Sequence, residues 1–231
     1  MRLFYQENFE ELLFLDEIDS KHCIRVLRKK ENDQIDVTDG AGNMFHCSIH
    51  DAHPKRTRLQ IIDKKEAFGK PNRYVSVAIA PTKNIDRTEY FVEKAVEIGV
   101  SEISFIQTAN SERKHLKLDR LNRIAIAGMK QSLKAYLPKM NDLMPFGQYI
   151  DELSLDATHQ KFMAHLSDDS IPLEKKEIGS RTHILIGPEG DFIESEIEKA
   201  RANGFEMVSM GQSRLRTETA GLVAVTLLNL L

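Results

Sequence analysis

The stretch that decides the fold is THILIGPEGDF, residues Thr182–Phe192. A short apolar run ends directly in Gly187 and Pro188, and a helical pattern begins at Glu194. A buried strand that passes through a tight loop into a helix is typical of an open α/β sheet. Ligands bind such sheets at the carboxyl ends of the strands, and glycine lets the backbone approach a ligand closely. The loop 187–190 is therefore the first candidate binding site.

A second stretch repeats this order near the end of the chain. A predicted strand at 205–210 leads through MGQSRLRTETA (Met210–Ala220) into an apolar helix at 217–231, and Arg216 and Glu218 stand at the helix start. Taken alone, either loop is more typical of an ordinary strand–helix connection than of a site. Neither contains G-x-G-x-x-G or a P-loop, so a dinucleotide or nucleoside triphosphate site is not supported.

The rest of the C-terminal part also alternates between strand and helix patterns. We predict strands at 74–80, 102–107 and 161–166, and helices at 84–98, 118–136 and 194–203. This order predicts a mostly parallel sheet with helices on both faces. The last helix is apolar on nearly every side, so it is expected in a core or against another subunit.

The first 70 residues have a different pattern. Short strands are predicted at 2–6, 34–39, 44–50 and 57–63, with one helical stretch at 16–28. Turn residues at 68–72 (FGKPN) then interrupt the chain. The sequence therefore predicts a small β-barrel-like domain over residues 1–70 and an α/β domain over residues 71–231.

Positive charge is concentrated in two runs, although the 231-residue chain has a net charge of −3. Residues 113–139 contain eight Lys and Arg with one acid, and residues 20–30 contain five with no acid. Such runs suit a face that binds a polyanion. They equally suit solvated faces that only confer solubility.

Several classes of protein are not supported. Two cysteines cannot form a disulfide framework, and no apolar run is long enough to span a bilayer. The acidic N-terminus lacks a signal-peptide pattern, so we expect a cytoplasmic protein. His22-Cys23 and His46-Cys47 have no zinc-ligand spacing, and neighbours on a strand point to opposite faces, so no metal is expected.

Over its whole length the chain resembles the ribosomal RNA small subunit methyltransferase E family of the SPOUT superfamily. The resemblance is carried by KNIDRTEYFVEKAVEIGV (83–100), KQSLKAYLPKM (130–140), IGPEGDF (186–192), MGQSRLRTETA (210–220) and the N-terminal HCIRVLRKK and VTDGAGN within 22–43. It implies an α/β fold with a C-terminal SPOUT domain, a parallel sheet and a deep trefoil knot, after a small PUA-like β-barrel that binds RNA. It also implies a homodimer.

The resemblance further implies an S-adenosyl-L-methionine-dependent enzyme that methylates N3 of a uridine in 16S rRNA, within the small ribosomal subunit. The implied cofactor residues are His165, Leu166, Ile186, Gly187, Pro188, Glu189, Gly190, Met210, Gly211, Ser213, Leu215 and Ala220. The residues expected to contact RNA are Arg2, His22, Arg25, Arg28, Lys29, Lys83, Arg113, Lys130 and Lys134. Arg216 is expected either to anchor a phosphate of the RNA or to stabilise negative charge on the uracil. Glu218 is the candidate base, although an acid at a helix start equally serves as a cap.

Two departures from the family pattern bear on the site. Many relatives have GPEGG, where this chain has Asp191 at the last position. They also have an EQS-x-R motif, where this chain has Lys130-Gln131-Ser132 followed by Lys134. Lysine keeps the charge but loses the planar fork that binds phosphate through two hydrogen bonds. Two other functions remain open at this point. One is a non-catalytic RNA-binding or ribosome-assembly protein with a degenerate knot, and the other is a related SPOUT enzyme that acts on tRNA.

Overall fold

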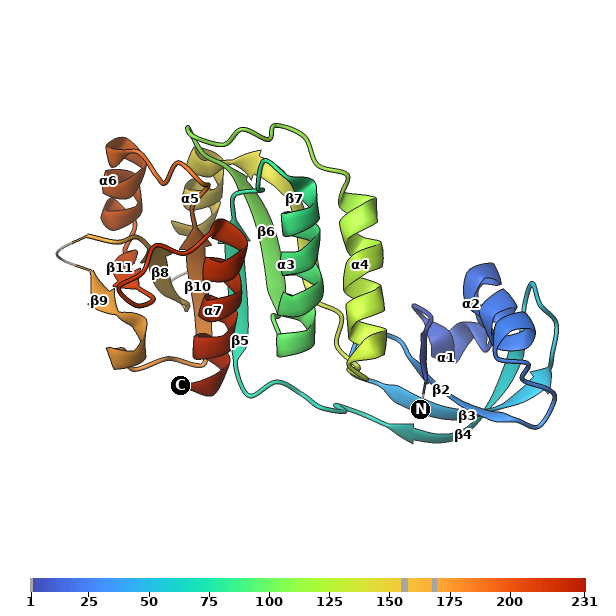
Figure 1. Cartoon of the computed structure of the whole chain (residues 1–231). Helices are drawn as coiled ribbons and strands as arrows, with labels where there is room; N and C mark the ends of the chain where they lie inside the picture. Colours follow the sequence, from blue (N-terminus) through green and yellow to red (C-terminus); the bar gives the residue numbers. More distant parts are fainter. Residues whose placement is uncertain (1, 155–157, 168–169) are drawn as a thin grey trace. The chain divides into compact units, whose positions relative to one another are not determined.

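The computed structural model describes residues 2–154, 158–167 and 170–231 (Figure 1). The chain forms two compact units. Unit 1 contains residues 1–70 together with 126–137, and unit 2 contains residues 71–125 and 138–231. The first division falls after Lys70, and the stretch 126–137 packs with the N-terminal part of the chain.

Unit 1 is built on a four-stranded sheet in the order β1-β2-β3-β4. Its strands are β1 (Leu3–Tyr5), β2 (Gln34–Thr38), β3 (Met44–Asp51) and β4 (Arg58–Lys65). β1 pairs with β2 in parallel, and the other two pairings are antiparallel. The predicted helix at 16–28 is divided into α2 (Glu17–Lys21) and a π-helical segment (His22–Val26), and α1 (Phe9–Leu12) was not predicted. In place of a closed barrel, the sheet has β1 and β4 as its edges among the described strands.

The core of unit 1 lies on one face of this sheet. Alternate residues of β3, namely Phe45, Cys47 and Ile49, are buried, as the period of two in a strand requires. The Phe45 ring meets the Phe9 ring edge-on at 5.0 Å between centroids. This contact fastens α1 to the sheet.

The stretch 126–137 is joined to unit 1 through the loop after β2. Gly42 N donates to Ala135 O at 2.8 Å, and Leu137 N donates to Gly40 O at 2.8 Å. Gly42 has φ +104°, and a Cβ atom there would lie 2.5 Å from the Tyr136 ring. Only glycine fits this backbone and this close approach.

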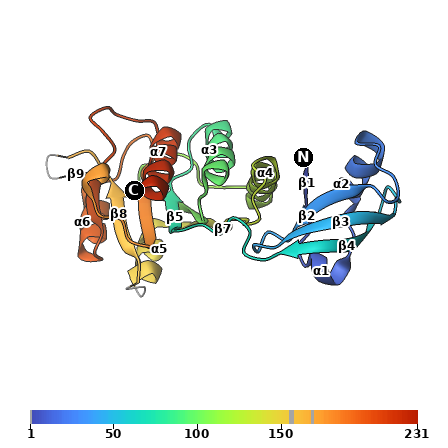
Figure 2. The ribbon, with the colours of Figure 1, turned by 90° about the horizontal axis from the view of Figure 1, so that it is seen from below.

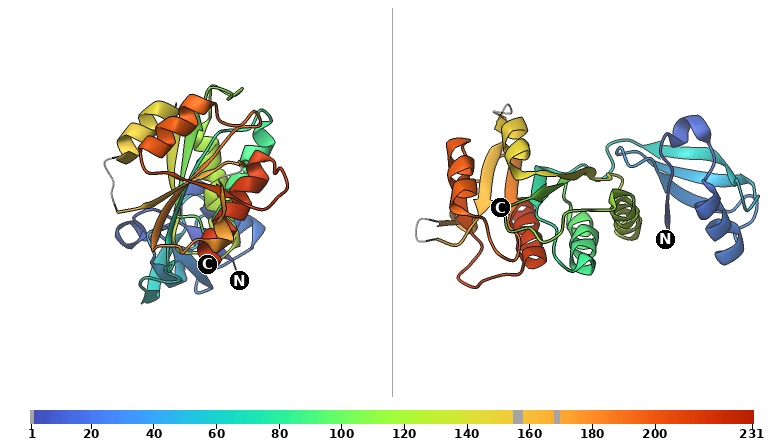
Figure 3. Two further views of the ribbon diagram at one scale, coloured as in Figure 1. Left: turned by 90° about the vertical axis from the view of Figure 1, so that its left-hand side faces the viewer. Right: turned by 90° about the horizontal axis from the view of Figure 1, so that it is seen from above.

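Unit 2 is a seven-stranded parallel sheet in the order β7-β6-β5-β10-β8-β11-β9. The strands are β5 (Tyr74–Ile79), β6 (Glu102–Gln107), β7 (Lys139–Pro145), β8 (Gln160–Ala164), β9 (Ile171–Pro172), β10 (Arg181–Ile186) and β11 (Glu206–Ser209). The helices are α3 (Ile85–Ile98), α4 (Leu118–Gln131, whose last turns belong to unit 1), α5 (Phe146–Ser154), α6 (Glu194–Ala202) and α7 (Thr217–Leu230), with a 3-10 turn at Leu173–Lys175. Helices α3 and α7 cover one face of the sheet, and α5 and α6 cover the other (Figures 2 and 3).

The parallel sheet with helices on both faces confirms the α/β prediction. Four elements differ from it. The sequence did not predict β7, β9 or α5, and the helix α4 ends at Gln131 and not at 136. Leu133 has φ +56°, and Ser132 Oγ donates to Gly128 O at 2.7 Å, so the backbone leaves the helix here without a glycine or proline.

No described helix is both long enough and apolar enough to cross a membrane.

Candidate active site

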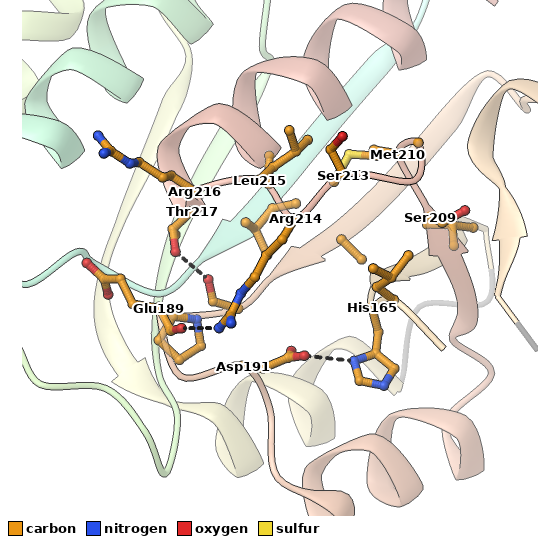
Figure 4. A pocket seen from close by; sticks show the side chains of 18 of the residues that line it. His165, Glu189, Asp191, Ser209, Met210, Ser213, Arg214, Leu215, Arg216 and Thr217 are labelled. Atoms are coloured by element: carbon orange, nitrogen blue, oxygen red, sulfur yellow. Dashed lines mark hydrogen bonds and ion pairs between the residues drawn. The ribbon is translucent and has the colours of Figure 1, made fainter. Parts of the chain in front are cut away.

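Three loops that are far apart in the sequence meet at the carboxyl edge of unit 2. They follow β8, β10 and β11, which are neighbours in the sheet. Together they enclose a cavity of about 640 Å³. Its lining residues are Arg87, Ala164, His165, Leu166, Ile186, Gly187, Pro188, Glu189, Asp191, Val208, Ser209, Met210, Gly211, Ser213, Arg214, Leu215, Arg216, Thr217 and Ala220 (Figure 4). The structure thus brings together all of the cofactor residues expected from the sequence, except Gly190.

The loop after β10 is braced from both sides. Thr217 Oγ1, at the start of α7, donates to Gly187 O at 3.0 Å, and Arg214 Nη2 donates to Glu189 O at 3.1 Å. Asn110 Nδ2 donates to the carbonyl oxygens of Gly190 and Asp191, both at 3.0 Å. Gly190 therefore lies against Asn110, outside the cavity lining, where it shapes the loop.

Asp191 occupies a left-handed backbone conformation, with φ +62°. Glycine adopts this conformation without strain and aspartate tolerates it better than most residues, so Asp191 is compatible with the backbone of this loop. The Asp191 carboxylate also makes two polar contacts. Oδ1 accepts from Phe192 N at 2.8 Å, and Oδ2 lies 3.2 Å from Nδ1 of His165, a cavity residue (Figure 4).

The two expected catalytic residues occupy different environments. Arg216 is exposed at the rim of the cavity, and its side chain points away from His165 and Asp191 (Figure 4). Glu218 is only 8% exposed and does not line the cavity. Its Oε1 atom lies 3.8 Å from Nε of Arg87, and among the described residues its buried Oε2 atom has no hydrogen-bond partner.

Arg87 is a cavity residue that sequence reasoning missed. It lies in the first turn of α3, four positions after Lys83, within the KNIDR segment that the family resemblance includes. Nothing in the segment alone separates Arg87 from an ordinary exposed helix residue. The position of Arg87 in the site depends on the packing of α3 beside α7, which places Arg87 next to Glu218.

Two of the residues expected to bind RNA lie in unit 2. Arg113 donates from Nε to Thr82 O at 3.0 Å and from Nη2 to Lys83 O at 2.6 Å. Its guanidinium therefore holds the loop after β5. Lys83 is exposed and its ammonium lies 2.8 Å from Glu112.

The other seven residues expected to bind RNA lie in unit 1. They differ in exposure and in whether their charge is already paired. Arg2, Arg25 and Arg28 are exposed, while Lys29 and Lys134 are partly buried. His22 packs edge-on against Phe4, and burial, followed by the charge of Arg2, lowers its pKa. His22 is therefore mostly neutral at pH 7.

The ammonium of Lys130 is already occupied by a partner within unit 1. It lies 2.6 and 2.7 Å from the two carboxylate oxygens of Asp19, which is 8% exposed.

The parallel sheet with a ligand-sized cavity at its carboxyl edge is typical of α/β enzymes that bind a small molecule. Comparison with known proteins identifies the family. Residues 70–229 match the model of the RNA methyltransferase domain family, and residues 15–62 match that of the RNA methyltransferase PUA domain. The chain is therefore an RNA methyltransferase by family.

Individual relatives narrow this class. The chain is 29% identical to the ribosomal RNA small subunit methyltransferase E of Mesomycoplasma hyopneumoniae, over 97% of both chains. A crystal structure described as a "probable rRNA-methyltransferase" from Porphyromonas gingivalis is 38% identical, covers 99% of this chain and 98% of its own, and has a TM-score of 0.90. A Legionella pneumophila protein solved with its bound cofactor S-adenosylmethionine is 25% identical, covers 99% and 96%, and has a TM-score of 0.87. The chain belongs to the ribosomal RNA small subunit methyltransferase E family.

Proposed function

We propose that this chain is an S-adenosylmethionine-dependent methyltransferase that methylates N3 of a uridine in 16S rRNA of the small ribosomal subunit. The observation that carries the proposal is the cavity itself. Loops after β8, β10 and β11 enclose one space, and eleven of the twelve residues expected to contact the cofactor line it. The relatives named for small subunit rRNA methylation support the substrate.

The cavity suits S-adenosylmethionine in size and chemistry. Its volume of about 640 Å³ is in the range of small-molecule sites. Gly187 and Gly211 leave main-chain groups accessible to an adenine edge, and the acids Glu189 and Asp191 suit a ligand with positive charges. When bound, the cofactor supplies a methyl group on a sulfonium centre.

The protein's part in the reaction is mainly positioning. N3 lies on the Watson–Crick edge of uracil, so the target uridine must be unpaired or flipped out of its helix. It must then be held in line with the methyl–sulfur bond. We propose that Arg216 stabilises the negative charge that develops on uracil as N3 loses its proton.

The sequence makes Glu218 a candidate proton acceptor, but the side chain is buried and does not line the cavity, so we do not propose it as the base. Its burial behind the cavity wall means that it reaches N3 directly only if the wall rearranges.

We also propose a division of labour along the chain. Residues 1–70 form the PUA-like domain that contributes RNA affinity through Arg2, Arg25, Arg28 and Lys29, and residues 71–231 form the SPOUT catalytic domain. The path of the loop 210–216 beside the loop after β10 is consistent with the trefoil knot of that superfamily. We place the protein in the cytoplasm, where rRNA is made.

A homodimer is the proposed working form. Helix α7 is apolar, yet Leu222, Val223 and Leu227 are only partly buried and Leu230 is 78% exposed. A second copy covering these side chains would remove them from water. Light scattering at micromolar concentration should give twice the chain mass, and a well-folded monomer would contradict the dimer.

The function is tested by adding labelled S-adenosylmethionine to the purified protein with 16S rRNA, assembled small subunits or tRNA. Calorimetry measures cofactor binding separately. We expect cofactor binding and label transfer to 16S rRNA or to the subunit. Transfer to tRNA alone would identify the related tRNA enzyme, and absence of cofactor binding would identify a non-catalytic RNA-binding protein.

A further inference from the structure

A second cavity, of about 480 Å³, adjoins the first. It is lined by Lys83, Asn84, Arg87, Glu112 and Glu189. Arg87 and Glu189 line both cavities, so they form the wall between them. The strand before the second cavity, β5, is the sheet neighbour of β10, and the two cavities therefore share the same edge of the sheet.

The loop after β5, which lines the second cavity, is held by several hydrogen bonds. Thr82 N and Thr82 Oγ1 lie 3.0 and 2.8 Å from Oγ1 of Thr88, and both threonines are buried. Arg113 binds the carbonyl oxygens of Thr82 and Lys83 from outside, and Lys83 N donates to Glu189 Oε1 at 3.1 Å. Because these bonds already order the loop after β5, a ligand that binds there loses little free energy in ordering it.

Arg87, which lines both cavities, has guanidinium N–H groups that are available to a ligand. Within residues 2–154, 158–167 and 170–231, its guanidinium makes no hydrogen bond to the protein. The nearest charged group is Glu218, whose Oε1 is 3.8 Å from Nε. Glu218 is 8% exposed, and its Oε2 has no partner among those residues. The buried carboxylate thus holds the guanidinium in place by charge and leaves its N–H groups available for a ligand.

We infer that the second cavity holds the target uridine, with Arg87 binding a uracil oxygen or the adjoining phosphate and Glu218 acting as a positioning residue for Arg87. This inference rests on the proposed function. The first cavity takes the cofactor, so the base that accepts the methyl group must enter from a neighbouring space, and the second cavity shares Arg87 and Glu189 with the first. Its lining combines cations with the acids Glu112 and Glu189. This mixture disfavours a polyphosphate and suits uracil, which presents oxygen acceptors beside an N–H donor.

The test uses the full-length protein and the variants Arg87→Gln and Arg87→Lys, with Lys94→Gln as the matched control. Lys94 lies seven residues further along α3 and is paired with Glu93 and Glu97, away from both cavities. Calorimetry measures S-adenosylmethionine binding, and single-turnover transfer of labelled methyl groups to 16S rRNA measures the reaction. We expect cofactor affinity within about twofold of wild type in all three variants. We expect methylation to fall about a hundredfold in Arg87→Gln and substantially in Arg87→Lys, with no change in Lys94→Gln.

Two results would overturn the inference. One is full methylation by Arg87→Gln, and the other is loss of cofactor binding in that variant, which would show that Arg87 binds the cofactor and not the uridine. A wild-type protein that does not bind the cofactor would instead refute the proposed function, so the two failures are distinguishable.

A double-mutant cycle tests the role of Glu218. If Glu218 acts through Arg87, Glu218→Gln lowers the methylation rate alone but adds little in the Arg87→Gln background. Independent, multiplying effects of the two substitutions would show that Glu218 acts on the substrate itself, and would contradict the positioning role.

Discussion

Lys130 and Asp19 form a two-point ion pair, with the ammonium 2.6 and 2.7 Å from the two carboxylate oxygens. The pair joins the end of α4 to α2, and the ammonium also lies 5.8 Å from the centre of the Phe4 ring. Asp19 additionally accepts from Tyr5 N at 3.4 Å. A lysine expected from the sequence to bind RNA thus serves to tie the stretch 126–137 to the rest of unit 1.

The first prediction is that Lys130→Met destabilises the protein. It leaves Asp19 with a buried, unpaired charge, and we expect a loss of about 1–3 kcal/mol in the free energy of unfolding. Urea unfolding of the full chain measures this. Lys134→Met is the control, because Lys134 has no ion pair in the described part of the chain. Adding Asp19→Asn to Lys130→Met should restore part of the loss, and a single variant as stable as wild type would refute the bracing role.

The second prediction concerns RNA affinity. Arg25 and Arg28 are exposed and have no acidic partner in the described structure. Each phosphate contact removed by Arg25→Glu or Arg28→Glu should lower the salt slope of RNA binding by about 0.7–0.9, while cofactor binding stays unchanged. Lys64→Gln is the control, because Glu10 and Glu66 already neutralise Lys64, at 2.8 and 3.1 Å. Slopes equal to wild type would show that this run is only a solvated face.

The third prediction concerns Gly187 and Gly211, two glycines of the cavity that we propose for the cofactor. In Gly187→Ala the new Cβ would lie 2.9 Å from the buried Phe192 ring, whereas in Gly211→Ala it meets nothing but is strained at φ +100°. Both should weaken S-adenosylmethionine binding at least about tenfold with unchanged far-UV circular dichroism. Gly204→Ala, with φ +82° and open space around it, is the matched control. It should lose stability but keep cofactor affinity, and normal binding by either cavity variant would show that the site is misplaced.

The fourth prediction distinguishes two arginines of the last loop. The Arg216 side chain makes no hydrogen bond within the described residues, while Arg214 braces Glu189 O at 3.1 Å. Arg216→Lys should keep cofactor affinity and lose on the order of a hundredfold in methylation, because the planar fork is gone. Arg214→Lys should lower cofactor affinity as well. Full activity of Arg216→Ala would remove this residue from the mechanism.

The fifth prediction is a loss of stability at alkaline pH. Burial raises the pKa of Cys23 to about 11 and that of Cys47 to about 12. An unfolded thiol titrates near 8.5, so above this pH the unfolded chain releases protons that the folded chain keeps, and the free energy of unfolding falls until the folded pKa is reached. Urea unfolding at pH 8 and pH 10 should show the loss. A Cys23→Ala, Cys47→Ala variant should show less of it, and an equal loss would assign the effect to other groups.

The parts of the site that were predictable are those in which a local pattern determines the backbone. Gly187, Pro188 and Gly211 mark loops after apolar strands, and such loops always lie at the carboxyl edge of a parallel sheet. Eleven of twelve expected cofactor residues therefore line one cavity. Gly190 differs because its neighbour Asn110 comes from a distant segment.

The features of the site that the sequence did not predict depend on contacts between segments far apart in the chain. The role that we propose for Arg87 depends on the packing of α3 beside α7, and Lys130 is neutralised by a residue 111 positions away. Strand β7 (KMNDLMP) lacks β-branched residues and lies at the sheet edge, so its composition carries little strand signal. The end of α4 likewise has no glycine or proline to mark it.

The most direct test of the central claim is to map modified nucleosides in small subunit rRNA from cells with and without this gene. Nuclease fragments locate the methyl group, and liquid chromatography of the nucleosides against authentic standards distinguishes 3-methyluridine from methylated uridines of equal mass. We predict one 3-methyluridine in 16S rRNA that is absent without the gene and restored by the wild-type protein, but not by Gly187→Ala. Identical 3-methyluridine in both strains, or loss of a different methylated nucleoside, would contradict the account.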